Sequence, residues 1–179
     1  WTDLTMGDNH ACARRGTVAA GALYCWGYNS NGELGLGHLT SQSAPVQVGV
    51  AADWASVAGG NGFTCGLRGF IGTGGAVACW GINTFGQVGT GIPARRPSPV
   101  AIGTATNWSG ISAGERASCG IRSSGAGQGE LYCWGRNESN QLGDGSDLPR
   151  STPTRIGVAS DWTQVAIGPN HACGLRGPP

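Results

Sequence analysis

The sequence predicts an all-β protein made of β-propeller blades of about 54 residues, and three observations support this. First, a Cys-Trp-Gly triplet recurs with a fixed spacing of 54 residues, beginning at Cys25, Cys79 and Cys133. Second, a block that opens on tryptophan and closes on cysteine recurs, beginning at Trp1, Trp54, Trp108 and Trp162. Third, each period contains three or four short segments that alternate large and small residues between glycine-rich turns, without a helical periodicity of 3.6.

The period divides the chain into repeats. Residues 1–53, 54–107 and 108–161 are three full repeats, and residues 162–179 begin a fourth, which gives roughly three and a third blades. The two ends hold duplicate parts of the repeat, so two copies of the chain cannot close a simple ring. Because propellers avoid open blade faces, we expect a segment of a larger propeller, or one protomer of an extended assembly that covers both ends.

The second repeat shows the expected order of elements. Trp54–Ala58 predicts a first strand, and the Gly59–Gly62 stretch predicts a turn. Phe63–Arg68 predicts a second strand, Gly69–Gly75 a glycine-rich loop, and Ala76–Gly81 a third strand. An irregular arm then follows.

The arm of each repeat ends on a proline motif that predicts a fourth strand. Pro45-Val46, Pro99-Val100 and Pro153-Thr154 occupy the same place in the three repeats. Proline cannot donate a hydrogen bond to a central ladder, so these segments suit edge strands.

Seven cysteines form two columns, and such a regular set is typical of disulfides in exported proteins. Free core thiols and a metal site remain as alternatives, although a zinc site would need close pairs such as C-x2-C, and none is present. The first column is Cys12, Cys65, Cys119 and Cys173, and the second is Cys25, Cys79 and Cys133.

Strand geometry favours pairing within each repeat, because opposed residues of antiparallel strands bring their Cβ atoms to roughly 4.5–5.5 Å. The expected pairs are Cys12–Cys25, Cys65–Cys79 and Cys119–Cys133. The alternative joins neighbouring repeats through Cys25–Cys65, Cys79–Cys119 and Cys133–Cys173. The favoured pairing leaves Cys173 unpaired in this chain, or paired outside it.

The repeated pattern, best seen in CWGINTFGQVGTG from Cys79 to Gly91, resembles the regulator of chromosome condensation repeat over nearly the whole chain. The resemblance implies four-stranded blades around a central axis, and the cysteine-bearing form is similar to secreted bacterial members. Two positions depart from the pattern: Glu33 stands in place of Gln, and Asn140 in place of Gly.

The turn after each Cys-Trp-Gly triplet has a structural interpretation. The tryptophans are large apolar groups that can fill the space between blades. Asn29, Asn83 and Asn137 can hydrogen-bond the turn backbone. A phosphate loop is not expected, because no helix follows and the chain contains no lysine.

Composition and the other motifs exclude several classes of function. A net charge of +1 gives no general attraction for nucleic acid, and no apolar run is long enough to span a membrane as a helix. His10 and His171 share a column with Phe63 and Ala117, so that column is not required for metal binding or catalysis. Asp144 and Asp147 lack the ligand count of a calcium loop. We therefore expect no enzymatic activity, no cofactor and no metal.

The remaining expectation is a secreted or cell-surface module, extracellular or periplasmic, for protein interaction or extracellular structure. Its partner would be another protein or further copies of the same repeat. The resemblance also leaves an enzyme inhibitor and a guanine-nucleotide exchange or chromatin-binding regulator as alternatives. Arginine and aromatic residues on arms and loops are the candidate contacts: Arg95, Arg96, Arg150, Phe70 and Phe85.

Overall fold

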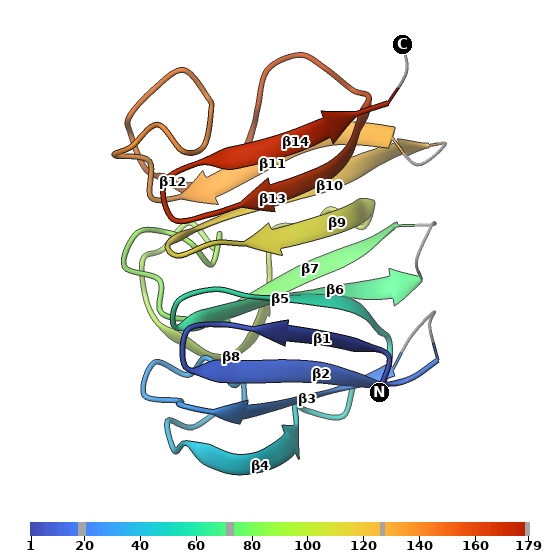
Figure 1. Cartoon of the computed structure of the whole chain (residues 1–179), viewed down its shortest axis with the longest axis vertical. Helices are drawn as coiled ribbons and strands as arrows, with labels where there is room; N and C mark the ends of the chain where they lie inside the picture. Colours follow the sequence, from blue (N-terminus) through green and yellow to red (C-terminus); the bar gives the residue numbers. More distant parts are fainter. Residues whose placement is uncertain (18–20, 71–73, 126–127, 178–179) are drawn as a thin grey trace.

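The computed structural model describes residues 1–17, 21–70, 74–125 and 128–177, with Phe70 described by its backbone alone. All regular elements in these ranges are β-strands, which pair into one 14-stranded sheet that folds into successive blades along the molecule (Figure 1). No helix in the described part of the chain could span a membrane. The predicted all-β fold is therefore confirmed.

Each full repeat forms a blade of four antiparallel strands that pair in chain order. Blade 1 contains β1 (Asp3–Met6), β2 (His10–Gly16), β3 (Gly21–Gly27) and β4 (Gln42–Gln47). Blade 2 contains β5 (Trp54–Gly59), β6 (Phe63–Phe70), β7 (Gly74–Gly81) and β8 (Arg96–Ala101). Blade 3 contains β9 (Trp108–Ala113), β10 (Ala117–Gly125), β11 (Gln128–Gly135) and β12 (Arg150–Arg155). The pair β13 (Trp162–Ile167) and β14 (Ala172–Arg176) begins the next blade.

The proline-containing strands are outer strands, as predicted. Each of β4, β8 and β12 pairs with a single described strand, the third strand of its own blade. The loop predicted over Gly69–Gly75 is shorter than expected, because β6 continues to Phe70 and β7 begins at Gly74. Backbone pairing in this hairpin therefore extends into glycine-rich sequence, and residues 71–73 lie outside the described part of the chain.

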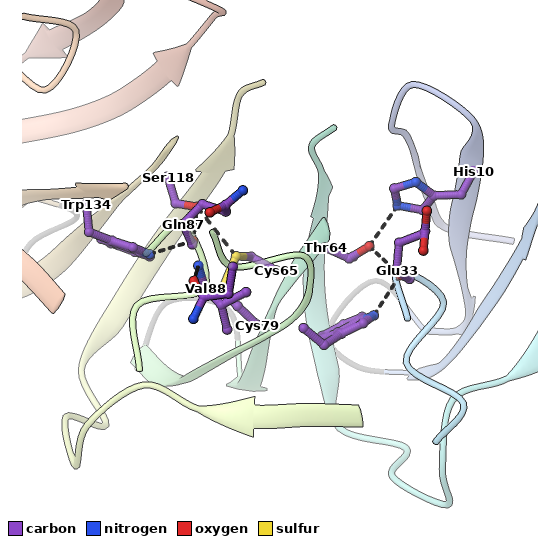
Figure 2. The surroundings of a disulfide bond; sticks show 11 residues. His10, Glu33, Thr64, Cys65, Cys79, Gln87, Val88, Ser118 and Trp134 are labelled. Atoms are coloured by element: carbon purple, nitrogen blue, oxygen red, sulfur yellow. Dashed lines mark hydrogen bonds between the residues drawn. A yellow bond between two sulfur atoms is a disulfide. The ribbon is translucent and has the colours of Figure 1, made fainter. Parts of the chain in front are cut away.

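Two of the three triplet tryptophans join neighbouring blades, which confirms the predicted place of Trp80 and Trp134 between blades. The indole Nε1 of Trp80 donates to the carbonyl oxygen of Glu33 at 2.8 Å, and that of Trp134 donates to Gln87 at 2.9 Å. Thr64 and Ser118 donate their hydroxyls to the same two carbonyls (Figure 2). Each of these two joints therefore uses one backbone oxygen of the preceding blade as an acceptor for two side chains of the next.

The turns between the first and second strands, which we call the inner turns, approach each other closely at a column of glycines. The column contains Gly7, Gly60, Gly114 and Gly168, which occupy the same place in the four repeats. A Cβ built on Gly60 would lie 2.6 Å from the Gly114 carbonyl oxygen, and one built on Gly114 would lie 2.6 Å from that of Gly168. Only glycine permits this backbone-to-backbone contact.

Candidate interaction surface

A disulfide lies at the centre of each full blade, between its second and third strands. The structure contains Cys12–Cys25, Cys65–Cys79 and Cys119–Cys133. In each blade the two cysteines are directly opposed in the strand register. All six side chains are fully buried, each pair in its own hydrophobic cluster. The pairs are those that strand geometry favours, and the alternative between neighbouring repeats is absent from the described residues.

Cys173 is a free, exposed cysteine on β14. It stands at the position that the bonded Cys12, Cys65 and Cys119 hold in the full blades. Within the described residues β14 pairs only with β13. Cys173 therefore lies on a strand whose second edge has no partner in the described part of the chain.

One asparagine closes each turn after the Cys-Trp-Gly triplet. The Asn83 side chain accepts the Val88 N–H at 2.8 Å and donates to the Ile92 carbonyl at 2.7 Å. Asn29 and Asn137 make the same two kinds of contact in their own blades. These asparagines hold the base of each arm, which places the arm residues on the same face of every blade.

Phe85, one of the predicted contacts, lies between two arginines of the next blade. The guanidinium of Arg116 lies 5.2 Å from the centre of the Phe85 ring, and that of Arg136 lies 6.0 Å away. Both arginines also form ion pairs, with Glu115 at 3.2 Å and Glu138 at 2.8 Å. We call Phe85, Arg116 and Arg136 the Phe85 cluster. Sequence reasoning missed the two arginines because they belong to a different repeat.

The three arginines predicted as contacts differ in how they are held. Arg95 is exposed and donates to the Ser30 carbonyl of the preceding blade at 3.0 Å. Arg150 is held by Asp144 of its own arm, with 2.6 Å between Nε and Oδ2. Arg96 opens β8 and is half-buried. The Arg150 side chain therefore binds within its own arm, whereas the Arg95 side chain connects two blades.

Asp144 is hydrogen-bonded by side chains of its own turn and arm. Burial pushes its pKa up, but hydrogen bonds from Arg150, Ser146 and Asn137 outweigh burial and lower the pKa below its usual value. No group of three or more metal-ligating side chains occurs among the described residues.

The predicted contacts do not all share one face. Phe70 ends β6, whereas Phe63, at the other end of that strand, lies beside the turn at Gly81. The backbone of Phe70 is therefore at the opposite end of the blade from the Phe85 cluster. The hairpin loop expected over Gly69–Gly75 falls partly outside the described residues.

The inner turns surround a cavity of about 680 Å³ near the central axis. Its wall includes glycine backbone from four repeats together with Met6, Asp8 and Glu115. Glu115 is also the ion-pair partner of Arg116. The cavity and the Phe85 cluster therefore meet on one face, which is the candidate interaction surface.

Comparison with family models gives matches along most of the chain. The model described as the regulator of chromosome condensation (RCC1) repeat matches residues 20–67 and 128–175, and a second model of the same description matches residues 108–141.

Two curated proteins show similar extents of identity. The probable E3 ubiquitin-protein ligase HERC3 of Homo sapiens is 32% identical over 177 residues, which are 94% of this chain and 16% of that protein. The ultraviolet-B receptor UVR8 of Arabidopsis thaliana is 31% identical over 180 residues, which are 97% of this chain and 37% of that protein. The chain thus spans well under half the length of these relatives.

Solved structures share the fold at lower identity. Yeast RCC1 (Prp20), solved bound to Kap60, has a TM-score of 0.78 and 20% identity over 98% of this chain and 42% of that one. Prp20p of Saccharomyces cerevisiae, in a study of its binding to Gsp1p and histones, has a TM-score of 0.76 and 20% identity over 98% and 44%.

The family models cover more than half of the chain, and the four-stranded blades agree with the neighbouring structures. The chain belongs to the regulator of chromosome condensation (RCC1) repeat family.

Proposed function

We propose that this chain is a non-enzymatic module for protein interaction, stapled by disulfides, that works outside the cytosol, either secreted or at the cell surface. The observation that carries the proposal is the buried disulfide at the centre of each full blade. Such bonds form and persist in oxidising compartments and are rare in the cytosol.

Protein binding is supported by the surface and by the family. The Phe85 cluster joins an aromatic ring with two arginines, and these residue types are enriched in interface hot spots. The yeast neighbour was solved with Kap60 bound, and a second study concerns binding of Prp20p to Gsp1p and histones. Both are proteins of the same fold that bind other proteins.

A capture experiment with the full chain tests the proposal. The oxidised chain is incubated with the extracellular fraction and, separately, with the cytosolic fraction of its source, and the retained proteins are identified by mass spectrometry. We expect a partner from the extracellular fraction that is lost in Phe85→Ala. The matched control is Arg155→Ala, which removes a half-exposed arginine of the Arg155–Glu130 ion pair on the outer strand β12.

Two results would argue against the proposal. Retention of no specific protein from either fraction would count against an interaction module. A partner found only in the cytosolic fraction, with the chain recovered from its source in reduced form, would place the function in the cytosol.

A further inference from the structure

The arm of each blade carries two positions, six residues apart, of which the second begins the outer strand. In blade 3 they are Asp144 and Arg150, which form an ion pair of 2.6 Å. The Asn137 amide that closes this turn also donates to Asp144, at 3.1 Å. In blade 2 the corresponding amide, Asn83, approaches Thr90 Oγ1 at 3.4 Å. Thr90 therefore occupies the place of Asp144.

Blade 2 has an arginine at the position of Arg150 but no carboxylate at the position of Asp144. Arg96 stands where blade 3 has Arg150, and Thr90 offers only a hydroxyl, which donates to the Ile92 carbonyl at 3.3 Å. Blade 1 has the neutral pair Leu36 and Gln42 at these positions. Among the described residues the Arg96 side chain has no hydrogen-bond or ion-pair partner, and its Nε atom is buried without an acceptor. A buried donor left in this way is unfavourable.

Arg96 and Thr90 line a cavity of about 450 Å³ that also contacts Thr152 and Pro153 of the outer strand of blade 3. A second cation, Arg122, lines the same cavity. Its guanidinium lies over the rings of Trp108 and Tyr132, at 4.6 and 4.2 Å from their centres. None of the residues that line this cavity is acidic. The Arg122 side chain hydrogen-bonds Tyr132, whose hydroxyl donates to Glu130, so Arg96 is the guanidinium at this cavity whose side chain has no partner among the described residues.

We propose that this cavity binds a carboxylate group of a ligand, which takes the place at Arg96 that the Asp144 side chain has at Arg150. A carboxylate matches the planar, charged donors of a guanidinium. The group could belong to a small organic acid or to an aspartate or glutamate of a protein. The second source would add this cavity to the interface proposed above, but carboxylate binding itself does not depend on that function.

Titration of the ¹⁵N-labelled full chain tests the proposal through the Nε–H signals of its arginines. The probes are acetate and two capped tripeptides, Gly-Glu-Gly and Gly-Gln-Gly, at constant ionic strength. We expect acetate and the Glu tripeptide to move the Arg96 signal saturably, and the Gln tripeptide to leave it in place. Stronger binding of the Glu tripeptide than of acetate would assign the site to protein ligands, and equal binding would assign it to small acids.

Variants of the two positions provide the controls. Arg96→Gln gives blade 2 the glutamine that blade 1 has at this position, Gln42. It should weaken carboxylate binding by about tenfold or more, because hydrogen bonds between charged groups are stronger than those between neutral groups. Thr90→Asp should supply the acid from within the chain, raise the melting temperature and abolish the titration. Thr90→Asn is the matched neutral control and should bind as the unmodified chain does.

Three outcomes would overturn the proposal. The first is the absence of a saturable shift with either carboxylate probe. The second is that, in Arg96→Gln, the Nε–H signals of the remaining arginines, including Arg122, titrate with the carboxylate probes as they do in the unmodified chain. The third is that Thr90→Asp behaves as Thr90→Asn does, both in melting temperature and in binding.

Discussion

A single imidazole distinguishes the joint between blades 1 and 2 from the joint that follows it. His10 is 5% exposed, and its Nε2 lies 2.8 Å from Thr64 Oγ1 (Figure 2). The Thr64 hydroxyl donates to the Glu33 carbonyl, so Nε2 must be the donor to Thr64. The other ring nitrogen, Nδ1, is buried without a described partner. At the next joint Phe63 takes this position.

This histidine predicts a loss of stability in acid. Burial lowers its pKa from 6.5 to about 4, against an opposing effect of Asp8. As the pH falls from about 6.5 to 4, the unfolded chain binds a proton that the folded chain does not. The free energy of unfolding should therefore drop across this window, by about 3 kcal/mol at most. Urea unfolding at several pH values measures the drop, and His10→Phe should remove it.

Glu33 acts in the opposite direction and has to be controlled. Burial raises its pKa, against backbone hydrogen bonds that lower it, so the folded chain binds this proton first and gains stability in acid. Glu33→Gln restores the residue found at Gln87 and Gln141, and should make the acid loss attributable to His10 steeper. An identical pH profile for Glu33→Gln with and without His10→Phe would contradict the assignment to His10.

A glycine and an asparagine at matching turn positions predict unequal effects of substitution on the free energy of unfolding. Gly86 has φ 83°, and a Cβ built on it would lie 2.5 Å from the Ser151 Cα of the next blade. Asn140 has φ 57° and is exposed. Gly86→Asn should therefore lower the free energy of unfolding by about 2 kcal/mol or more. Asn140→Gly should change it by less than about 1 kcal/mol. Chemical denaturation measures both, and equal effects would show that the contact with Ser151 does not set the requirement.

At the scale of the element, the disulfide joins the second and third strands of each blade. Each bond closes 13 or 14 residues, for which the chain-entropy model gives roughly 3 kcal/mol. We expect Cys65→Ala with Cys79→Ala to lose about that much, measured by denaturation in the absence of reductant. Peptide mapping without reduction should return the three pairs within blades. Recovery of pairs 40 residues apart would reject this arrangement.

The order of strands was predictable because each strand carries its own local signal. Trp54 and Phe63 mark where two strands begin, and Pro99 marks an outer strand, since these preferences depend on a few neighbouring residues. The length of the hairpin was not predictable, because Gly69 and Gly75 look like loop residues until a partner strand pairs with them. Backbone pairing between strands needs no side chain, and composition therefore gave no sign of it.

The candidate surface was predictable only in part, for a related reason. Phe85 could be named as a loop aromatic, but Arg116 and Arg136 reach it from another repeat. Arg150 and Arg96 look equivalent in the sequence, and only the neighbouring Asp144 or Thr90 distinguishes them. Such contacts depend on how blades sit against each other, which a pattern within one repeat does not specify.

At the scale of the whole molecule, stability should vary along the row of blades. Repeat architectures gain stability from each unit and from contacts with its neighbours. Blade 2 contacts blades on both sides, whereas the side chains of β14 are exposed throughout. We expect amide hydrogen exchange, followed by mass spectrometry, to be slowest in β6 and β7 and fastest in β14. Uniform protection from β6 to β14 would contradict this and indicate a single cooperative unit.

The glycine column and the interblade tryptophans together set the curvature of the molecule. Near the axis, neighbouring blades are separated only by backbone, as between Gly60 and Gly114. Farther out, whole indole rings such as Trp80 and Trp134 stand between them. Each blade is therefore a wedge, thin inside and thick outside, and the difference in thickness fixes the angle from one blade to the next. A larger residue in the column or a smaller one at the tryptophan would change that angle, and with it the number of wedges that complete a circle.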